Sequence, residues 1–173
     1  PGAVNLRLAD LETAGGLDEA VAIAAAAGIP AQNALIGDAS GRIAWVIAGR
    51  IPARGGHEAS LPSSWATPGT GWQGWVEGER QPRIVDPAGG FAWSANSRVV
   101  GGDALALIGD GGYAHGARGR QIRDALAGMH RAGPGDFLRI HLDERALYLA
   151  QWQALLVQVL ESDDDTQAGP LSL

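Results

Sequence analysis

Residues 29–54 read IPAQNALIGDASGRIAWVIAGRIPAR, and this stretch decides how the rest of the chain must be arranged. Two apolar runs, 33–37 and 42–49, flank a four-residue segment that begins with Asp38 and ends with Gly41. Since aspartate can cap its own turn and glycine accepts a positive φ, the segment predicts a hairpin turn. The second run is apolar on both faces. We therefore expect a strand pair buried on both faces, at the centre of a layered α/β (α+β) domain.

The composition is that of one glycine-rich domain, or of a piece of a larger one. The chain has 173 residues, of which 46% are hydrophobic, and its 26 glycines and 9 prolines favour turns and ordered loops. A net charge of −6 without a basic cluster argues against nucleic acid and anionic membranes as partners. Because there is no cysteine, disulfides, thiolate metal sites and a cysteine nucleophile are excluded.

Helices are predicted on both sides of the hairpin in the sequence. Residues 17–27 (LDEAVAIAAAA) carry acidic residues in the first turn and are rich in alanine, the strongest helix former. A short amphipathic helix is expected at 120–127, and Pro134 should begin another segment. The largely apolar run 146–160 predicts a longer helix that buries most of its circumference.

The remaining segments are expected to be extended or loop-like. Residues 91–100 (FAWSANSRVV) follow a glycine-rich turn and predict a third strand, while residues 5–11 predict a short strand or an extended lead-in. Residues 55–87 are rich in glycine, proline and tryptophan. Since indole rings are costly to leave in water, we expect an ordered loop held by its tryptophans rather than a linker. Residues 101–119 are predicted to be a loop.

Few residues carry a chemical signal by themselves. The four histidines are scattered without a cysteine or histidine partner at metal-ligand spacing, which favours structural or surface roles. Asn96 stands out as a polar residue within the run 91–100. The simpler interpretation is a capped or bulged strand end, and the functional one is an amide donor aimed into a site, as in an oxyanion hole.

Several segments, taken in their order, resemble the penicillin acylase (penicillin amidase) family of N-terminal-nucleophile hydrolases. The hairpin is similar to the family's Pro-x-Gln-Asn strand, which turns at Asp-x-x-Gly and returns to Gly-x-x-Pro-x-Arg. LPSSWATPGTGWQGW at 61–75 and DPAGG at 86–90 are similar to its Pro-Gly-x-Gly…Trp-x-Gly loop and the turn that follows. FAWSANSRVV matches its strand ending in Ala-Asn-Asn, and GARGRQIRDAL at 116–126 its Arg-x-x-Arg-Ile-x-x-Leu helix. The resemblance covers residues 5–160 and implies part of a four-layer αββα sandwich.

The resemblance implies that the attacking group lies outside this chain. In the family, a serine at the new amino terminus of the β-subunit attacks a linear amide, and its own α-amine is the general base. No such serine aligns here, so the chain resembles an interior fragment of the β-subunit that is inactive alone. The family's oxyanion asparagine falls on Asn96, although the second asparagine of the pair is Ser97 in this sequence. The supporting arginine corresponds best to Arg120, with Arg118 as the alternative.

The resemblance also implies a reaction that requires no cofactor, and a structural calcium ion in the parent enzyme. The calcium ligands nearest to the family pattern are the backbone carbonyl of Ala59 and the carboxylate of Asp110, with Asp103 as a rival. The implied substrate is a small-molecule N-acyl amide: a penicillin or cephalosporin, an N-acyl-homoserine lactone or a related N-acyl amine. The implied partner is the remainder of an α/β heterodimer, in the periplasm or secreted.

Two further expectations concern the chain as a whole. A partial acylase domain is expected at 1–162, followed by an acidic, flexible tail at 163–173. A strand pair that lacks its partner sheet would expose an apolar patch, so the fragment is expected to self-associate or to have an unusual packing partner. The alternative to an acylase fragment is a non-catalytic structural or binding module on the same scaffold.

Overall fold

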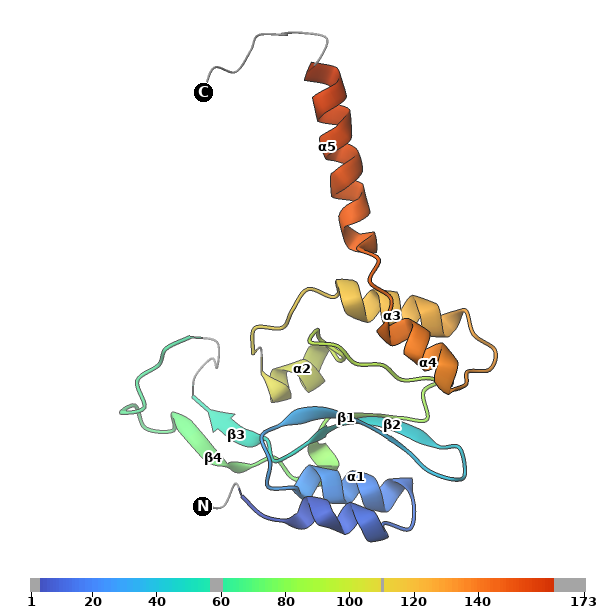
Figure 1. Ribbon diagram of the computed structural model, residues 1–173. Coiled ribbons are helices and arrows are strands. Elements are labelled where there is room, and N and C mark those ends of the chain that lie inside the picture. Colours follow the sequence, from blue (N-terminus) through green and yellow to red (C-terminus); the bar gives the residue numbers. More distant parts are fainter. Residues whose placement is uncertain (1–3, 57–60, 110, 164–173) are drawn as a thin grey trace. The chain divides into compact units, whose positions relative to one another are not determined.

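The computed structural model describes residues 4–56, 61–109 and 111–163, which divide into two compact units between Gly128 and Met129. The first unit contains two antiparallel sheets and most of the helices, and the second is helical (Figure 1). Helices combined with antiparallel sheets confirm the α+β class. The four-layer sandwich and the predicted 162/163 boundary stay predictions. In the part of the chain that the structure describes, no helix has the length and apolar character needed to span a bilayer.

The predicted hairpin is confirmed and lies in a three-stranded antiparallel sheet. Strand β1 (Gln32–Gly37) pairs with β2 (Ile43–Ala48), and β2 pairs with β5 (Arg83–Val85). At the turn, the Asp38 carboxylate accepts hydrogen bonds from the Ser40 backbone N–H at 2.9 Å and from the Ser40 hydroxyl at 2.6 Å. Gly41 closes the turn with a φ of 88°, a conformation that favours glycine.

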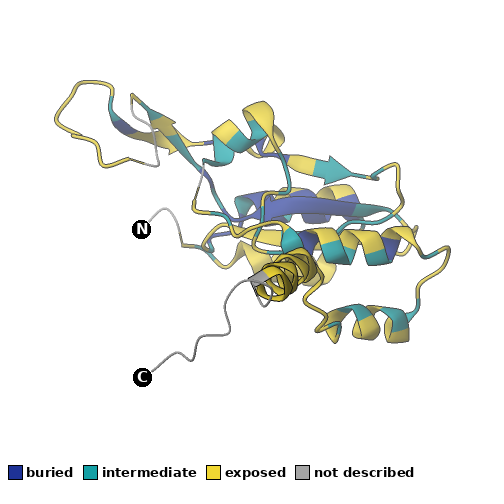
Figure 2. Ribbon diagram, turned by 90° about the horizontal axis from the view of Figure 1, so that it is seen from above, coloured by how far each residue is buried: buried dark blue, intermediate teal, exposed yellow. Residues whose placement is uncertain are grey.

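Strand β2 is the most buried element of the chain (Figure 2). On one face it contributes Ala44, Val46 and Ala48, which pack against the apolar side chains of helix α1 (Leu17–Ala26). On the other face Trp45 and Ile47 pack with Ile51 and Val76. The N-terminus of α1 is tied to the hairpin turn, because the Leu17 backbone N–H donates to Asp38 Oδ2 at 3.1 Å.

Burial on both faces, predicted for the whole hairpin, is wrong for β1. This strand forms one edge of the sheet, and its Leu35 side chain is 52% exposed. The predicted third strand at 91–100 is also wrong: the segment is irregular and bends at Asn96, and β5 takes its place. β5 is held there by Asp86, whose backbone N–H donates to the Ile43 carbonyl at 2.9 Å and whose carboxylate pairs with Arg42 at 2.9 Å.

A second sheet begins just before the segment 55–87, which was predicted as an ordered loop, and its second strand lies within that segment. Its two strands, β3 (Pro52–Gly55) and β4 (Gly71–Trp75), are antiparallel, and the short helix η2 (Gly78–Arg80) follows. The indoles of Trp65 and Trp72 contact each other with ring centroids 6.0 Å apart, and both side chains stay more than half exposed. The segment is therefore more regular than predicted, and its tryptophans are less buried.

Three helical segments of the first unit differ from their predictions. Residues predicted as a strand or lead-in form the 3₁₀ helix η1 (Arg7–Thr13), and residues predicted as loop contain α2 (Gly102–Ile108). Helix α3 (Ala117–Ala127) begins three residues before its predicted start. Asn5 explains part of the first difference, because its side chain holds the chain against the end of α1: its amide donates to the Ala26 carbonyl and accepts from the Gly28 N–H.

The second unit consists of α4 (Pro134–His141), η3 (Leu147–Leu149) and α5 (Ala150–Asp163). Pro134 begins α4, as predicted, and the Asp136 carboxylate accepts from the Gly133 N–H at 2.7 Å. The prediction that the last helix buries most of its circumference is wrong, since residues 151–162 are all exposed. The only other α-helix described in this unit has eight residues and offers no layer that could cover α5.

Candidate functional site

Asn96 lies in the irregular segment between β5 and α2, and its position is fixed by backbone hydrogen bonds. Its carbonyl accepts from the Ala114 N–H at 2.7 Å, and the next residue, Ser97, donates its N–H to the Ala95 carbonyl at 2.7 Å. The residue as a whole is exposed. This is neither a strand interior nor a strand end, so the simpler sequence interpretation does not describe it.

The side chain of Asn96 is oriented by Arg118. The Nη2 atom of Arg118 donates to Oδ1 of Asn96 at 2.6 Å, a short, charge-assisted hydrogen bond. Because a guanidinium can only donate, the contact requires the oxygen of the amide to face Arg118. The Nδ2 group of Asn96 therefore points its two N–H donors elsewhere, where a ligand oxygen could accept them.

Gly119 lets α3 approach the Asn96 segment closely. A Cβ atom at this position would lie 2.8 Å from the Ser97 hydroxyl oxygen, 3.9 Å from Ala95 Cβ and 4.0 Å from Trp93 Nε1. Glycine is the one residue that avoids these contacts in the first turn of the helix. The close packing at Gly119 places the neighbouring Arg118 within reach of Asn96.

Arg120, the first choice from the sequence, has a different neighbour. Its Nε atom lies 3.8 Å from Oδ2 of Asp124, one helical turn further along α3, and its side chain is 77% exposed. Residues 118 and 120 point about 200° apart on a helix, so only one of them can face Asn96. The structure brings Asn96 together with Arg118. The position of each arginine around the helix axis distinguishes the two. This criterion can be applied only when it is known that Gly119 packs against the Asn96 segment.

The residues implied for calcium are not brought together here. Ala59 and Asp110 fall outside the described residues, and the rival Asp103 lies exposed in the first turn of α2. Among the residues that the structure describes, no group of three or more histidine, aspartate or glutamate side chains is arranged to hold a metal ion. The calcium site stays a prediction.

Two groups with shifted pKa values, Asp38 and Arg42, lie at the hairpin turn, away from Asn96. The pKa of Asp38 is lowered, chiefly by the hydrogen bond from the Ser40 hydroxyl and further by backbone N–H donors. The pKa of Arg42 is raised by hydrogen bonds to the carboxylates of Asp18 and Asp86. These groups join α1, the hairpin and β5, so the shifts have a structural cause.

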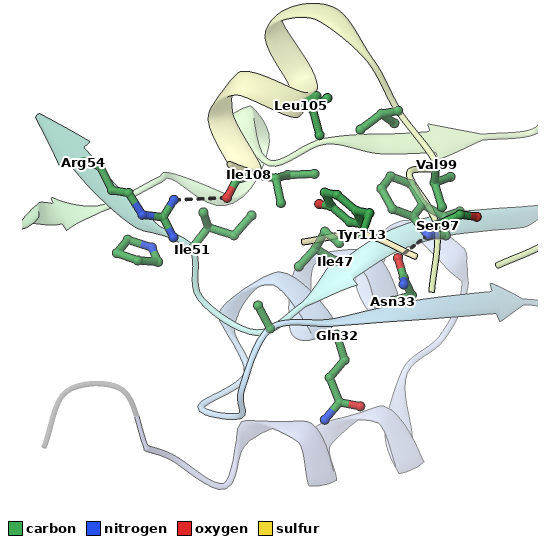
Figure 3. A pocket seen from close by; sticks show the side chains of 14 residues that line it. Gln32, Asn33, Ile47, Ile51, Arg54, Ser97, Val99, Leu105, Ile108 and Tyr113 are labelled. Atoms are coloured by element: carbon green, nitrogen blue, oxygen red, sulfur yellow. Dashed lines mark hydrogen bonds between the residues drawn. The ribbon is translucent and has the colours of Figure 1, made fainter. Parts of the chain in front are cut away.

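An apolar cavity of about 180 Å³ lies between the hairpin and the Asn96 segment (Figure 3). Trp45 and Ile47 of β2 line it on one side, and Ser97 and Tyr113 line it as well. A polar contact holds one wall, because Trp45 Nε1 donates to Asn33 Oδ1 at 2.9 Å (Figure 3). The cavity therefore joins the buried face of β2 to the residue beside Asn96.

The fold and this geometry define an α+β scaffold that presents a side-chain amide donor, oriented by an arginine, next to an apolar cavity. The model of the penicillin amidase family matches residues 3–172, and the chain belongs to that family. A stretch of 76 residues is 36% identical to the penicillin acylase 2 proenzyme of Pseudomonas sp. (strain SE83). It spans 44% of this chain and 10% of that relative, so the chain accounts for a small part of the relative's length. The resemblance inferred from the motifs is confirmed.

Proposed function

We propose that this chain is a fragment of an acylase that hydrolyses a linear amide bond, and that the attacking N-terminal serine lies outside it. Membership of the penicillin amidase family supports an amide-hydrolysing parent. The observation that carries a role for this chain is the 2.6 Å hydrogen bond from Arg118 to Asn96. It supports Asn96 as the side-chain donor of an oxyanion hole, with Arg118 as its positioning residue.

The proposed chemistry needs a donor at the carbonyl oxygen of the substrate. Attack of a serine hydroxyl on an amide carbonyl places negative charge on that oxygen in the tetrahedral intermediate. The Nδ2–H group of Asn96 stabilises this charge more than it stabilises the neutral carbonyl, which lowers the barrier. Arg118 keeps the amide in the productive orientation, and its positive charge on Oδ1 polarises the Nδ2–H donor.

The wider setting of the reaction follows from the family and is part of the same proposal. The substrate is a small-molecule N-acyl amide, whether a penicillin or cephalosporin, an N-acyl-homoserine lactone or a related N-acyl amine. The partner is the remainder of an α/β heterodimer, located in the periplasm or secreted. The chemistry requires no cofactor, and a structural calcium ion in the parent would draw on Asp110 and the Ala59 carbonyl.

One observation favours a second candidate, a non-catalytic binding or structural module. The residue after Asn96 is Ser97 where the family pattern has a second asparagine, which changes the immediate neighbour of the proposed donor. On a scaffold without catalytic function, Asn96 and Arg118 would form a surface contact that orders the loop. This candidate predicts that the parent lacks amide-hydrolase activity.

The test is an amide-hydrolysis assay of the full-length parent with Asn96→Ala beside the unaltered enzyme. Loss of one oxyanion-hole donor should lower kcat by about 10²–10³. Gln121→Ala, which truncates an amide side chain on α3, is the control and should change kcat little. Equal turnover by the Asn96→Ala enzyme would remove the proposed role, and a parent without any amide hydrolysis would favour the second candidate.

A further inference from the structure

We propose that a second pocket, beside the Asn96 segment, binds a small organic anion that carries a carboxylate on an aromatic body. The pocket has a volume of about 400 Å³, within the range of roughly 300–1,000 Å³ typical of small-molecule sites. It shares Ser97 and Tyr113 with the smaller cavity of Figure 3, so the two hollows have a common wall. The proposal does not rest on the proposed amide hydrolysis.

Three arginines line this pocket, although the chain as a whole is acidic. Arg98 comes from the irregular segment that carries Asn96, and Arg120 and Arg123 come from α3. The two helical arginines are three residues apart and so project from neighbouring positions on the same helix face. No acidic residue lines the pocket among the described residues. The pocket is therefore locally positive in a chain of net charge −6, which suits an anionic ligand.

The charge on the two helical arginines is only partly balanced by the nearest carboxylate. Asp124 accepts two hydrogen bonds from Arg123, at 2.9 Å from Nε and 2.6 Å from Nη2. The same carboxylate is the ion-pair partner of Arg120, but at 3.8 Å, which is too long for a hydrogen bond. One carboxylate thus faces two guanidiniums, and the donors of Arg120 are left for a ligand. A planar guanidinium can bind a carboxylate through two parallel hydrogen bonds.

Aromatic rings supply the remaining wall of the pocket. Trp93 and Tyr113 both line it, and the Arg98 guanidinium lies 6.0 Å from the centroid of the Tyr113 ring. Trp93 is supported by Phe91, with ring centroids 5.7 Å apart. An aromatic ligand body can stack on these rings while its carboxylate faces the arginines. This combination favours an aromatic carboxylate over an inorganic anion.

Calorimetric titration of the full 173-residue chain with sodium benzoate, and separately with benzamide, tests the proposal. The two compounds share a ring and a planar head group, but only benzoate is charged. We expect saturable binding of one benzoate per chain, at least about tenfold tighter than that of benzamide, because charge-assisted hydrogen bonds are roughly twice as strong as neutral ones. Inorganic phosphate should bind more weakly than benzoate, since it lacks the ring.

Two arginine variants localise the binding. Arg120→Gln should weaken benzoate binding by about tenfold, and Arg80→Gln, which removes one exposed positive charge from η2 outside the pocket, by less than about twofold. Circular dichroism of both variants confirms that the fold is retained. Absence of saturable benzoate binding, equal affinity for benzamide, or equal losses in the two variants would each overturn the proposal.

Discussion

Gly49, the residue after β2, should not tolerate a side chain, and the structure gives the size of the effect. Its φ is 103°, and its N–H donates to the Ala24 carbonyl at 2.9 Å, which ties the end of β2 to α1. A Cβ atom would lie 2.7 Å from the Ile29 carbonyl oxygen and 3.1 Å from Ala31 Cα, both of them backbone atoms that no rotamer change can move. The left-handed conformation costs an L-residue about 1–2 kcal/mol, and overpacking adds about 1–3 kcal/mol.

Gly41 in the hairpin turn is the matched control for Gly49→Ala. It has a similar φ of 88°, but a Cβ atom there would meet nothing within 4 Å, so Gly41→Ala isolates the conformational cost of about 1–2 kcal/mol. Urea unfolding followed by tryptophan fluorescence and far-UV circular dichroism measures both variants. With an m-value of about 2 kcal/mol/M, the midpoint should fall by about 0.5–1 M for Gly41→Ala and about 1–2.5 M for Gly49→Ala. Equal shifts in the two variants would refute the close approach of the chain at Gly49.

Two further predictions concern pH and association. The lowered pKa of Asp38 means that its contribution to stability is complete above its unfolded pKa, about 3.9, and is lost as the pH falls through the folded pKa. Asp38→Asn should therefore flatten the acid side of the curve of urea midpoint against pH, and an unchanged curve would contradict the assignment. The apolar side chains of α5, half exposed, should make the isolated chain self-associate, so the mass from light scattering should rise with concentration. Leu156→Glu should reduce that rise, and a monomer at every concentration would refute the expectation.

The sequence predicted local structure well where the residue types strongly favour one backbone conformation. Asp38 and Gly41 fixed the hairpin turn, and the alanine-rich run with its acidic start fixed α1 to within one residue. The continuous apolar run of β2 predicted burial on both faces, which the structure confirms. The turn and the helix were predictable because each depends on contacts between neighbours in sequence, and β2 is buried because α1 covers one face and Ile51 and Val76 cover the other.

The predictions that failed depend on contacts between distant residues. Burial of β1 requires a layer on both of its faces, and burial of α5 requires a layer that the other helices described in its own unit do not supply. The segment at 91–100 has strand-like composition, yet Asp86 secures β5 at the edge of β2 in its place. The choice between Arg118 and Arg120 depended on the close approach at Gly119, which no local pattern reveals.

The central claim, that Arg118 acts by orienting the Asn96 amide, is tested most directly by a double-mutant cycle in the full-length parent. The measurement is kcat for amide hydrolysis by the unaltered enzyme, Asn96→Ala, Arg118→Ala and the double variant. If Arg118 acts through Asn96, each single change lowers kcat and the double variant is no slower than Asn96→Ala. In the Asn96→Ala enzyme Arg118 has no amide left to orient, so removing Arg118 as well should cost nothing more. Losses that multiply in the double variant would show two independent roles and contradict the account.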